Sequence, residues 1–305
     1  MKLLVLGSSA GGGFPQWNCN CRNCRGLREG SIRTRARTQS SVAVSNDSSN
    51  WVLINASPDI LTQIGSIEQF TPNDGIRNSP IKAVILVDSQ IDHTTGLLML
   101  REGDRLPIYC TENVREDLIA GNPILRVLES YCGTDWNRIP IESSDGFTIS
   151  GFDGLHFHAM AVDGKAPPYS PHRDAHLPGD NIALTITNQA SGRSIFYAPG
   201  LARVDDRVAQ WMSRADCILV DGTFWSEDEM TRQGAGRKSA SEMGHLPQSG
   251  SDGMLTHLSR FQASRKILIH INNTNPLLDE DSAERRQVER MGIEVAFDGM
   301  EIEIR

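Results

Sequence analysis

Four side chains of metal-binding type follow hydrophobic runs that are typical of strands. The runs are residues 81–87, 217–220 and 266–269, and the candidates that come after them are Asp92, His93, Asp221 and His270. In α/β folds, ligands gather just outside the carboxyl ends of strands. We therefore expect the four side chains to meet at one edge of the sheets and to act there as the catalytic and active-site metal residues.

The residues just before Asp92 indicate which metal this site suits. Asp88 and Gln90 stand there, and an amide oxygen is a poor zinc ligand, whereas carboxylates suit harder metals such as iron or manganese. A histidine with carboxylates and open positions is typical of non-haem iron sites that activate dioxygen. The pattern favours one metal ion, with Asp221 either a further ligand or an anchor for a ligating histidine.

A second possible metal site is the cluster Cys19, Cys21 and Cys24. Cysteines this close do not pair easily in relaxed disulfide geometry, but as thiolates they can occupy three corners of a tetrahedral zinc site. Idle reduced thiols are the alternative. For the fourth, structural ligand we predict His245, which lies among turn-forming residues, ahead of Cys132.

The remaining histidines have less distinctive surroundings. His172 and His176 lie in a long polar loop of a kind that is often functional, and we predict that they bind substrate together with Gln90; an ordinary surface loop is the alternative. His156 and His158 alternate along one strand, so they face the same side. That pair is either a metal pair or a solvated strand face.

The composition excludes several classes of protein. The 305 residues include 38 acidic and 30 basic side chains, and the formal charge of −8 argues against a general nucleic-acid binder. No segment approaches the roughly 18–20 consecutive apolar residues that span a bilayer. The N-terminus lacks a secretory signal, so we expect a cytoplasmic protein with reduced thiols. The glycine-rich start, residues 7–13, does not match a dinucleotide-binding motif, and we expect a tight loop that approaches the active centre.

The distribution of apolar residues predicts a layered α/β fold. Strand-like runs recur along the chain at 3–6, 42–45, 51–54, 81–87, 107–110, 155–162, 181–187, 194–197, 217–220, 266–271, 293–297 and 300–304. Helical patterns lie between them at 95–101, 112–120, 204–212, 250–261 and 279–291. Several runs are continuously apolar, which is typical of strands covered on both faces. Sheets covered by helices are the expected architecture.

Several segments match a known family. They are LGSSAGGG at 6–13, PQWNC at 15–19, DSQIDHT at 88–94, PGDN at 178–181 and FDGMEI at 297–302. On these motifs the chain resembles the coenzyme PQQ synthesis protein B family, which has the metallo-β-lactamase fold. The resemblance implies a four-layer αβ/βα sandwich, in which two packed mixed β-sheets carry helices on their outer faces. It also implies a single domain over residues 1–305, with a zinc-binding loop at about 11–30.

The resemblance also implies a function in the synthesis of pyrroloquinoline quinone (PQQ). The family has been described as an iron-dependent hydroxylase that uses O₂ on a tyrosine-derived intermediate, which arises from a peptide's crosslinked Glu and Tyr. It has also been described as a carrier of PQQ or a precursor towards the periplasm. The implied partners are that small molecule and other pathway proteins, with a homodimer possible and no membrane span.

Two features of the wider fold bear on these roles. Its hydrolases carry His-x-His-x-Asp-His, but here Asp88 and Gln90 replace the leading histidines, so a two-zinc hydrolase such as a phosphodiesterase is disfavoured. The cysteine loop is similar to that of a cyclic phosphodiesterase of phosphonate metabolism. In that relative three cysteines and one histidine hold a structural zinc, and His245 is matched to its histidine.

Overall fold

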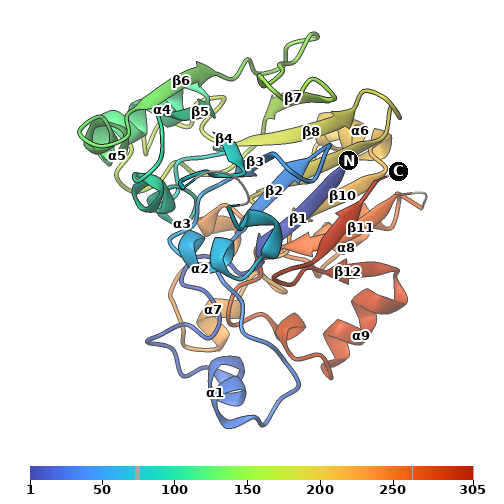
Figure 1. Ribbon diagram of the computed structural model, residues 1–305. Coiled ribbons are helices and arrows are strands. Elements are labelled where there is room, and N and C mark those ends of the chain that lie inside the picture. Colours follow the sequence, from blue (N-terminus) through green and yellow to red (C-terminus); the bar gives the residue numbers. More distant parts are fainter. Residues whose placement is uncertain (73–75, 263, 305) are drawn as a thin grey trace.

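The computed structural model describes residues 1–72, 76–262 and 264–304, and the strands within these ranges form two sheets (Figure 1). One has seven strands in the order β13-β1-β2-β3-β4-β5-β6, and the other has six in the order β12-β11-β10-β9-β8-β7. The strands are β1 (Lys2–Gly7), β2 (Ser41–Ser45), β3 (Trp51–Ile54), β4 (Ile81–Ile85), β5 (Leu106–Cys110), β6 (Thr134–Arg138), β7 (Leu155–Ala161), β8 (Ile182–Asn188), β9 (Ser194–Ala198), β10 (Cys217–Asp221), β11 (Arg265–Ile269), β12 (Ile293–Val295) and β13 (Glu301–Glu303).

Both sheets are mixed. Strands β3 to β6 are parallel to one another, as are β9 to β12, whereas β13-β1-β2-β3 and β7-β8-β9 are antiparallel. Because β1 pairs with β13, the two ends of the chain lie side by side (Figure 1). The Met1 amino group donates a hydrogen bond to the Ile304 carbonyl at 3.2 Å.

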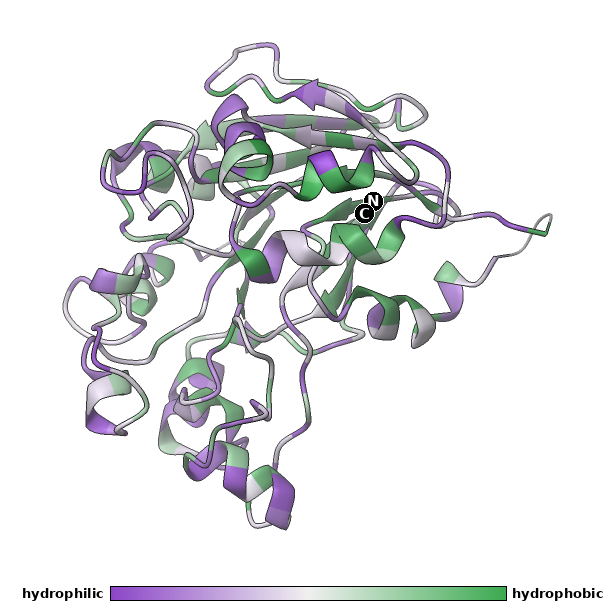
Figure 2. Ribbon diagram, turned by 90° about the vertical axis from the view of Figure 1, so that its left-hand side faces the viewer, coloured by the Kyte–Doolittle hydropathy of each residue, from purple (hydrophilic) through white to green (hydrophobic). Residues whose placement is uncertain are grey.

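The continuous apolar strands are explained by burial on both faces. Successive side chains of a strand point to opposite sides, so in β1 Leu3 and Val5 face the core between the sheets, while Leu4 and Leu6 face outwards. Tyr197 of β9 joins the central core from the second sheet. Figure 2 shows hydrophobic residues in the strands and along parts of the helices, with hydrophilic residues on other parts of the helices and in the loops.

Helices cover both outer faces and complete four layers. Ile60 of α2, Val114 of α4 and Leu125 of α5 pack on the seven-stranded sheet. The six-stranded sheet is covered in the same way by α6, α8 and α9. The helices are α1 (Arg22–Glu29), α2 (Ile60–Gly65), α3 (Ile91–Thr94), α4 (Glu112–Glu116), α5 (Ile124–Leu128), α6 (Asp206–Arg214), α7 (Glu229–Arg232), α8 (Met254–Leu258) and α9 (Ala283–Arg290), with short turns η1 (Glu68–Phe70), η2 (Thr95–Leu100), η3 (Asp117–Gly121), η4 (Ser241–Met243) and η5 (Pro276–Leu278). The predicted αβ/βα sandwich is confirmed.

Two elements that the hydrophobic pattern does not reveal have local causes. Strand β6 reads Thr-Asp-Trp-Asn-Arg and pairs only with β5 at the edge of its sheet, so its polar residues stay hydrated. Helix α1 has a strongly polar sequence and begins at a cap formed by the Cys21 sulfur, which accepts from the Cys24 amide. Pairing with β5 determines strand β6, and the Cys21 cap determines where α1 begins. Hydrophobic periodicity determines neither.

The strands that end near the candidate metal residues lie in different sheets. Strand β4 belongs to the seven-stranded sheet, whereas β10 and β11 are neighbours in the six-stranded one. The segment after β4 closes against the second sheet, where the Ile182 amide donates to the Val87 carbonyl at 2.9 Å. The ends of β4, β10 and β11 therefore meet where the two sheets come together. None of the described helices is both long and hydrophobic enough to pass through a bilayer.

Candidate metal centre

Three of the predicted metal residues converge on one point. One ligand atom each from Asp92, His93 and His270 lies within 4.8 Å of the others, and His270 Nε2 is 3.3 Å from Asp92 Oδ2. The rings of His93 and His270 meet edge to face, with centroids 5.2 Å apart. His93 and His270 are 2% and 5% exposed, so the group is sheltered from water. The predicted convergence of these three residues is confirmed.

Asp88 orients His93. Both carboxylate oxygens of Asp88 lie 2.8 Å from His93 Nδ1, so the Nδ1–H donates to Asp88 and Nε2 is the nitrogen left for a ligand or metal ion. His93 Nε2 is buried and has no hydrogen-bond partner among the described residues. A buried nitrogen that finds no partner needs an explanation, and a metal ion at that position supplies one.

His270 is held by its backbone and by Thr223. It follows β11 with φ of 63°, the left-handed region, which bulky residues seldom adopt and which is often seen at functional sites. His270 Nδ1 lies 2.8 Å from Thr223 Oγ1, and that hydroxyl donates to Asp221 Oδ1 at 2.6 Å. Because Nδ1 is occupied by this chain, Nε2 is the nitrogen that faces Asp92.

Asp221 anchors this arrangement. It is fully buried, and its Oδ1 also accepts from the Thr223 amide at 2.9 Å, while Oδ2 accepts from the Leu201 amide at 2.9 Å. With these bonds made, Asp221 is better placed to orient histidines than to bind an ion directly. Asp221 also presents a carboxylate oxygen within 4.8 Å of ligand atoms of His245 and His270, so the geometry is compatible with both roles left open by the sequence.

His245 belongs to this centre and not to the cysteine cluster. Its Nδ1 lies 2.7 Å from Asp221 Oδ2, and its ring stacks on that of His270 with centroids 5.4 Å apart. The loop that carries it is tied to the end of β9, where the Leu246 amide donates to the Leu201 carbonyl at 2.8 Å. The prediction that His245 completes the cysteine site is wrong, because this tether draws the histidine to the strand ends.

The charges of the centre match a cation. Burial opposes ionisation of Asp92, but the positive charge of His93 and the hydrogen bond from His270 hold the pKa of Asp92 far below its usual range. Burial works against protonation of His93, but Asp88 and Asp92 raise the pKa of His93 to about 9. Burial likewise opposes ionisation of Asp221, but the positive charge of His245 outweighs burial and lowers the pKa of Asp221. The carboxylates thus stay ionised, and a metal ion would take the place of the histidine protons.

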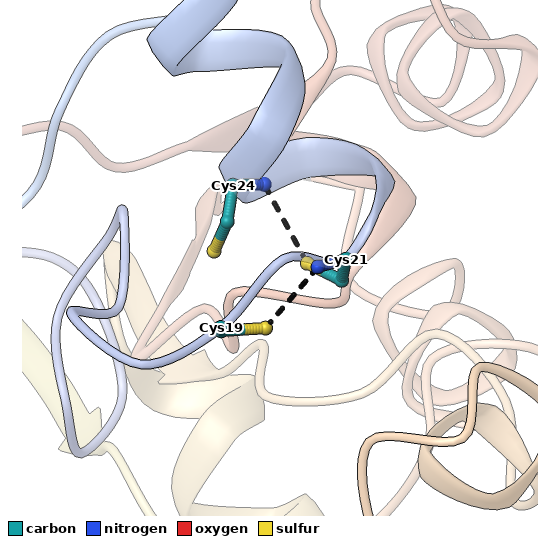
Figure 3. Close-up of side chains that lie close together, drawn as sticks. All are labelled: Cys19, Cys21 and Cys24. Carbon is teal, nitrogen blue, oxygen red and sulfur yellow. Dashed lines mark hydrogen bonds between the residues drawn. The ribbon is translucent and has the colours of Figure 1, made fainter.

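The three cysteines form a compact group of their own (Figure 3). Their sulfur atoms lie within 4.8 Å of one another and point into a common space. The Cys21 amide donates to Cys19 Sγ at 3.4 Å, and the Cys24 amide to Cys21 Sγ at 3.5 Å. Burial raises the pKa of Cys21 to about 12, whereas the amide of Cys21 outweighs burial and lowers the pKa of Cys19.

Asn273 is the residue from a distant segment that meets these cysteines. Its Nδ2 lies 3.4 Å from Cys24 Sγ and 3.8 Å from Cys21 Sγ, and its carbonyl accepts from Asn23 Nδ2 at 3.1 Å. Asn273 comes three residues after His270, so one short segment touches both groups. In the described chain Asn273 therefore takes the place beside the cysteines that was predicted for His245.

Both groups border one cavity of about 720 Å³. Its wall is rich in amide side chains, and Lys165 is the lone lysine or arginine among the described residues that line it. Gly11 lies so close that a Cβ atom there would sit 3.1 Å from Asp92 Oδ2. The expected approach of the glycine loop to the centre is confirmed.

The predicted substrate residues are separated by the structure. Gln90 lines the cavity and donates to the Lys165 carbonyl at 2.8 Å. His172 and His176 do not line it. His172 Nε2 lies 3.0 Å from Asp180 Oδ1, and His176 lies near aspartates of its own loop. Their expected contact with substrate is therefore corrected, because both rings lie near aspartates of their own loop and outside the cavity.

Comparison with known proteins decides the family. Residues 50–271 match the Beta-lactamase superfamily domain. The chain is 57% identical over 303 residues to coenzyme PQQ synthesis protein B of Azoarcus sp. (strain BH72). The matched region covers 98% of this chain and 99% of the relative. The chain belongs to the coenzyme PQQ synthesis protein B family. A second member, from Pseudomonas syringae pv. tomato, is 53% identical over the whole of both chains.

Solved structures agree with this assignment. Zn(2+)-bound PqqB from Methylobacterium extorquens superposes with a TM-score of 0.89 at 37% identity and covers all of both chains. A diphosphatase from the PhnP family, at 20% identity and a TM-score of 0.65, covers 99% of this chain and 96% of its own and shows the shared fold alone. The resemblance and the fold predicted from the sequence are both confirmed.

The contacts of several site residues escape sequence reasoning. The hydrogen bond between His93 and Asp88 could have been expected from their separation of five positions, and Thr223 from its place two residues after Asp221. Nothing near His245 or Asn273 in the sequence indicates their partners, which come from segments brought together only by folding.

Proposed function

We propose that this chain acts in PQQ biosynthesis as a non-haem iron-dependent hydroxylase, which uses O₂ to oxidise a tyrosine-derived intermediate. The observation that carries the proposal is the group Asp92, His93 and His270, with one carboxylate and two imidazoles facing one point. Two histidines and one carboxylate with open positions are the ligand set of iron(II) oxygenases. The names of the relatives support the pathway.

The residues present fit one iron ion. Asp92 offers an oxygen, His93 offers its unpartnered Nε2, and His270 offers Nε2 because Thr223 holds its Nδ1. Bound there, iron would activate dioxygen and provide open positions for the substrate. Asp88 supports this geometry, because it fixes the ring of His93 and its tautomer.

His245 suits proton transfer. Asp221 holds its Nδ1 and, although burial works in the other direction, raises the pKa of His245. Its Nε2 is the nitrogen left to accept or return the proton of a substrate hydroxyl. Because His245 lines the cavity beside His270, a phenol held near the centre would lie close to the His245 ring.

The cavity wall suits a polar substrate with carboxylates. Lys165 supplies a cation, and the amides of Gln16, Gln90 and Asn181 supply neutral donors and acceptors. A molecule derived from glutamate and tyrosine carries carboxylates, an amine and a phenol, which these groups can pair. We therefore propose Gln90 and Lys165 as substrate contacts.

A two-metal hydrolase is less compatible with these contacts. The positions of its leading histidines are taken by Asp88, which is bonded to His93, and by Gln90, which is bonded to Lys165. Neither residue offers an imidazole to a second ion, and a two-metal clamp needs ligands for both.

For the cysteines, we propose a structural zinc. Three thiolates at this spacing fit three corners of a tetrahedral zinc site, and a bound ion would lower the pKa of Cys21 from its raised value. The site would tie the loop before α1 to the segment around Asn273, since their contacts already join there.

The test uses the full chain loaded with iron(II) under argon. Addition of the tyrosine-derived intermediate and then air should consume O₂ and add oxygen to the substrate, as measured with an oxygen electrode and by mass spectrometry. His93→Ala should abolish both signals, and His176→Ala, a matched histidine outside the cavity, should leave them unchanged. Tight binding of the intermediate with no O₂ consumption would instead support a carrier, and full turnover in His93→Ala would refute the assignment of the centre.

A further inference from the structure

A second concave site lies on the outer face of the six-stranded sheet. A groove of about 520 Å³ runs between the outer sides of β7 and β8, helix α6 and the turn at 142–144. Its size is within the roughly 300–1,000 Å³ of small-molecule sites. Its lining residues and those of the metal cavity do not overlap. A ligand in this groove would therefore bind independently of the metal centre.

Aromatic rings line one side of the groove. His158 meets Trp211 edge to face, with centroids 6.5 Å apart and planes at 86°, and His156 meets His158 at 4.6 Å. Met160, which is 1% exposed, lies at the base of the groove. Trp211 is only partly buried, so part of the indole remains available to a flat partner. These features suit a planar aromatic ring.

Arginines of α6 supply positive charge beside these rings. Arg207 is paired with Glu142 at 2.5 Å and with Asp205 at 3.6 Å. Arg214, at the end of the same helix, is exposed, and its guanidinium makes no ion pair or hydrogen bond with the part of the chain that the structure describes. A guanidinium can bind a carboxylate through two parallel hydrogen bonds, so Arg214 is available to a ligand carboxylate. The protein carries a net charge of −8, so attraction of an anion here must come from these local cations.

The opposite wall of the groove is held in an unusual conformation. Glu142 has φ of 56°, in the left-handed region that side chains other than glycine seldom adopt. Its amide donates to the Ala159 carbonyl of β7 at 2.8 Å, and its side chain reaches across to Arg207. Backbone strain of this kind persists where the surroundings enforce it and often marks a binding site.

We propose that this groove binds a planar aromatic carboxylate, with its ring against Trp211 and His158 and its carboxylate on Arg214. The ring contacts and the unpaired guanidinium independently indicate this ligand class, and the strained wall marks the groove as a binding site. The site does not depend on the metal centre or on the function proposed for it.

Isothermal titration calorimetry of the full chain with 2-naphthoate tests the proposal, and the neutral isostere 2-naphthamide shows whether the charge matters. We expect 2-naphthoate to bind, and 2-naphthamide to bind at least about tenfold more weakly, as loss of one charge-assisted hydrogen bond implies. Arg214→Ala should weaken 2-naphthoate by about tenfold, Arg214→Lys by less, and Trp211→Ala should weaken both compounds.

Matched variants identify the location. Arg290→Ala, an exposed arginine of α9, and His270→Ala, in the metal centre, should leave the affinity for 2-naphthoate unchanged. Circular dichroism verifies that each variant is folded. Absence of 2-naphthoate binding, equal affinity for the two compounds, unchanged affinity in Arg214→Ala, or loss of binding in His270→Ala would each overturn the proposal.

Discussion

The metal centre and the cysteine cluster border the same cavity but are built in different ways. The cysteines lie within residues 19–24, and a single loop with the start of α1 brings their sulfurs together. In the centre, by contrast, His270 and Asp92 are separated by 178 positions. Asp88, Thr223 and Asp221 then hold the histidines by hydrogen bonds. A cluster that is local in the chain can rely on its own loop for geometry, whereas one assembled from distant strands needs supporting residues.

One segment links the two regions. His270 reaches the centre, and Asn273 contacts the cysteines. The next residue, Thr274, donates to Glu229 Oε1 at 2.5 Å, and Asn275 donates to the Gln248 side chain at 3.0 Å. These bonds hold the segment in place from the side away from both regions. A change in one region should therefore leave the backbone conformation of the other unchanged. The contrast between the regions can therefore be tested one region at a time.

The largest effect is expected in His270→Ala. Loss of a direct ligand should reduce metal affinity at the centre by more than about 100-fold, since even a supporting residue contributes about 10–100-fold. Zinc at the cysteines should remain, as measured by elemental analysis of purified protein. His176→Ala is the matched control with unchanged metal content. Loss of both metals in His270→Ala would show that the two regions are not independent.

Cys21→Ser should have the next largest effect and the opposite pattern. One tightly held zinc should be lost and the free energy of unfolding should fall by about 3 kcal/mol or more, because loss of a structural metal is among the most damaging changes. Iron should still load at the centre. Cys132→Ser, a partly buried cysteine outside the cluster, should retain the zinc. An unchanged zinc content in Cys21→Ser would refute the structural site.

Asp88→Asn tests the supporting residues of the centre. The amide keeps the size of the side chain but loses the charge that holds His93 Nδ1–H, so metal affinity should fall by about 10–100-fold. Competition with a metal chelator measures the change. Since the hydrogen bonds of Asp88 go to His93 and to the Gln90 amide and not to the cysteine loop, its zinc should be unaffected. Wild-type affinity in this variant would mean that Asp88 does not orient His93.

The smallest effect is expected for Glu229, which contacts the segment that links the two regions. It should appear as a change in the pH dependence of stability. Burial raises the pKa of Glu229 from 4.5 to about 7. The folded protein thus holds a proton that the unfolded chain releases, and stability should decrease as pH rises between those values. Glu229→Gln should remove this decrease, which for a shift of this size is at most about 3 kcal/mol, measured by urea unfolding at several pH values. Glu68→Gln, at an exposed site, should keep the wild-type profile, and an identical profile in Glu229→Gln would contradict the raised pKa.

Sequence reasoning succeeded where a pattern has one physical cause. Runs such as 217–220 are apolar throughout because both faces of the strand are covered, and each predicted run contains a strand. It failed where the partner is remote. His245 was expected beside Cys21 but lies on Asp221, and His172 was expected in the cavity but pairs with Asp180.

The chain's residue pattern was enough to establish the layered fold, the cysteine cluster and the strand ends that carry Asp92, His93 and His270. These follow from hydrophobic periodicity and from short spacings, which are properties of neighbouring residues. The supporting contacts of Asp88, the place of His245, the approach of Asn273 to the cysteines and the groove beside Arg214 were decided only by tertiary structure. Each depends on how two sheets and their long loops pack, and hydrogen bonds between residues far apart in the chain leave no local pattern from which they could be read.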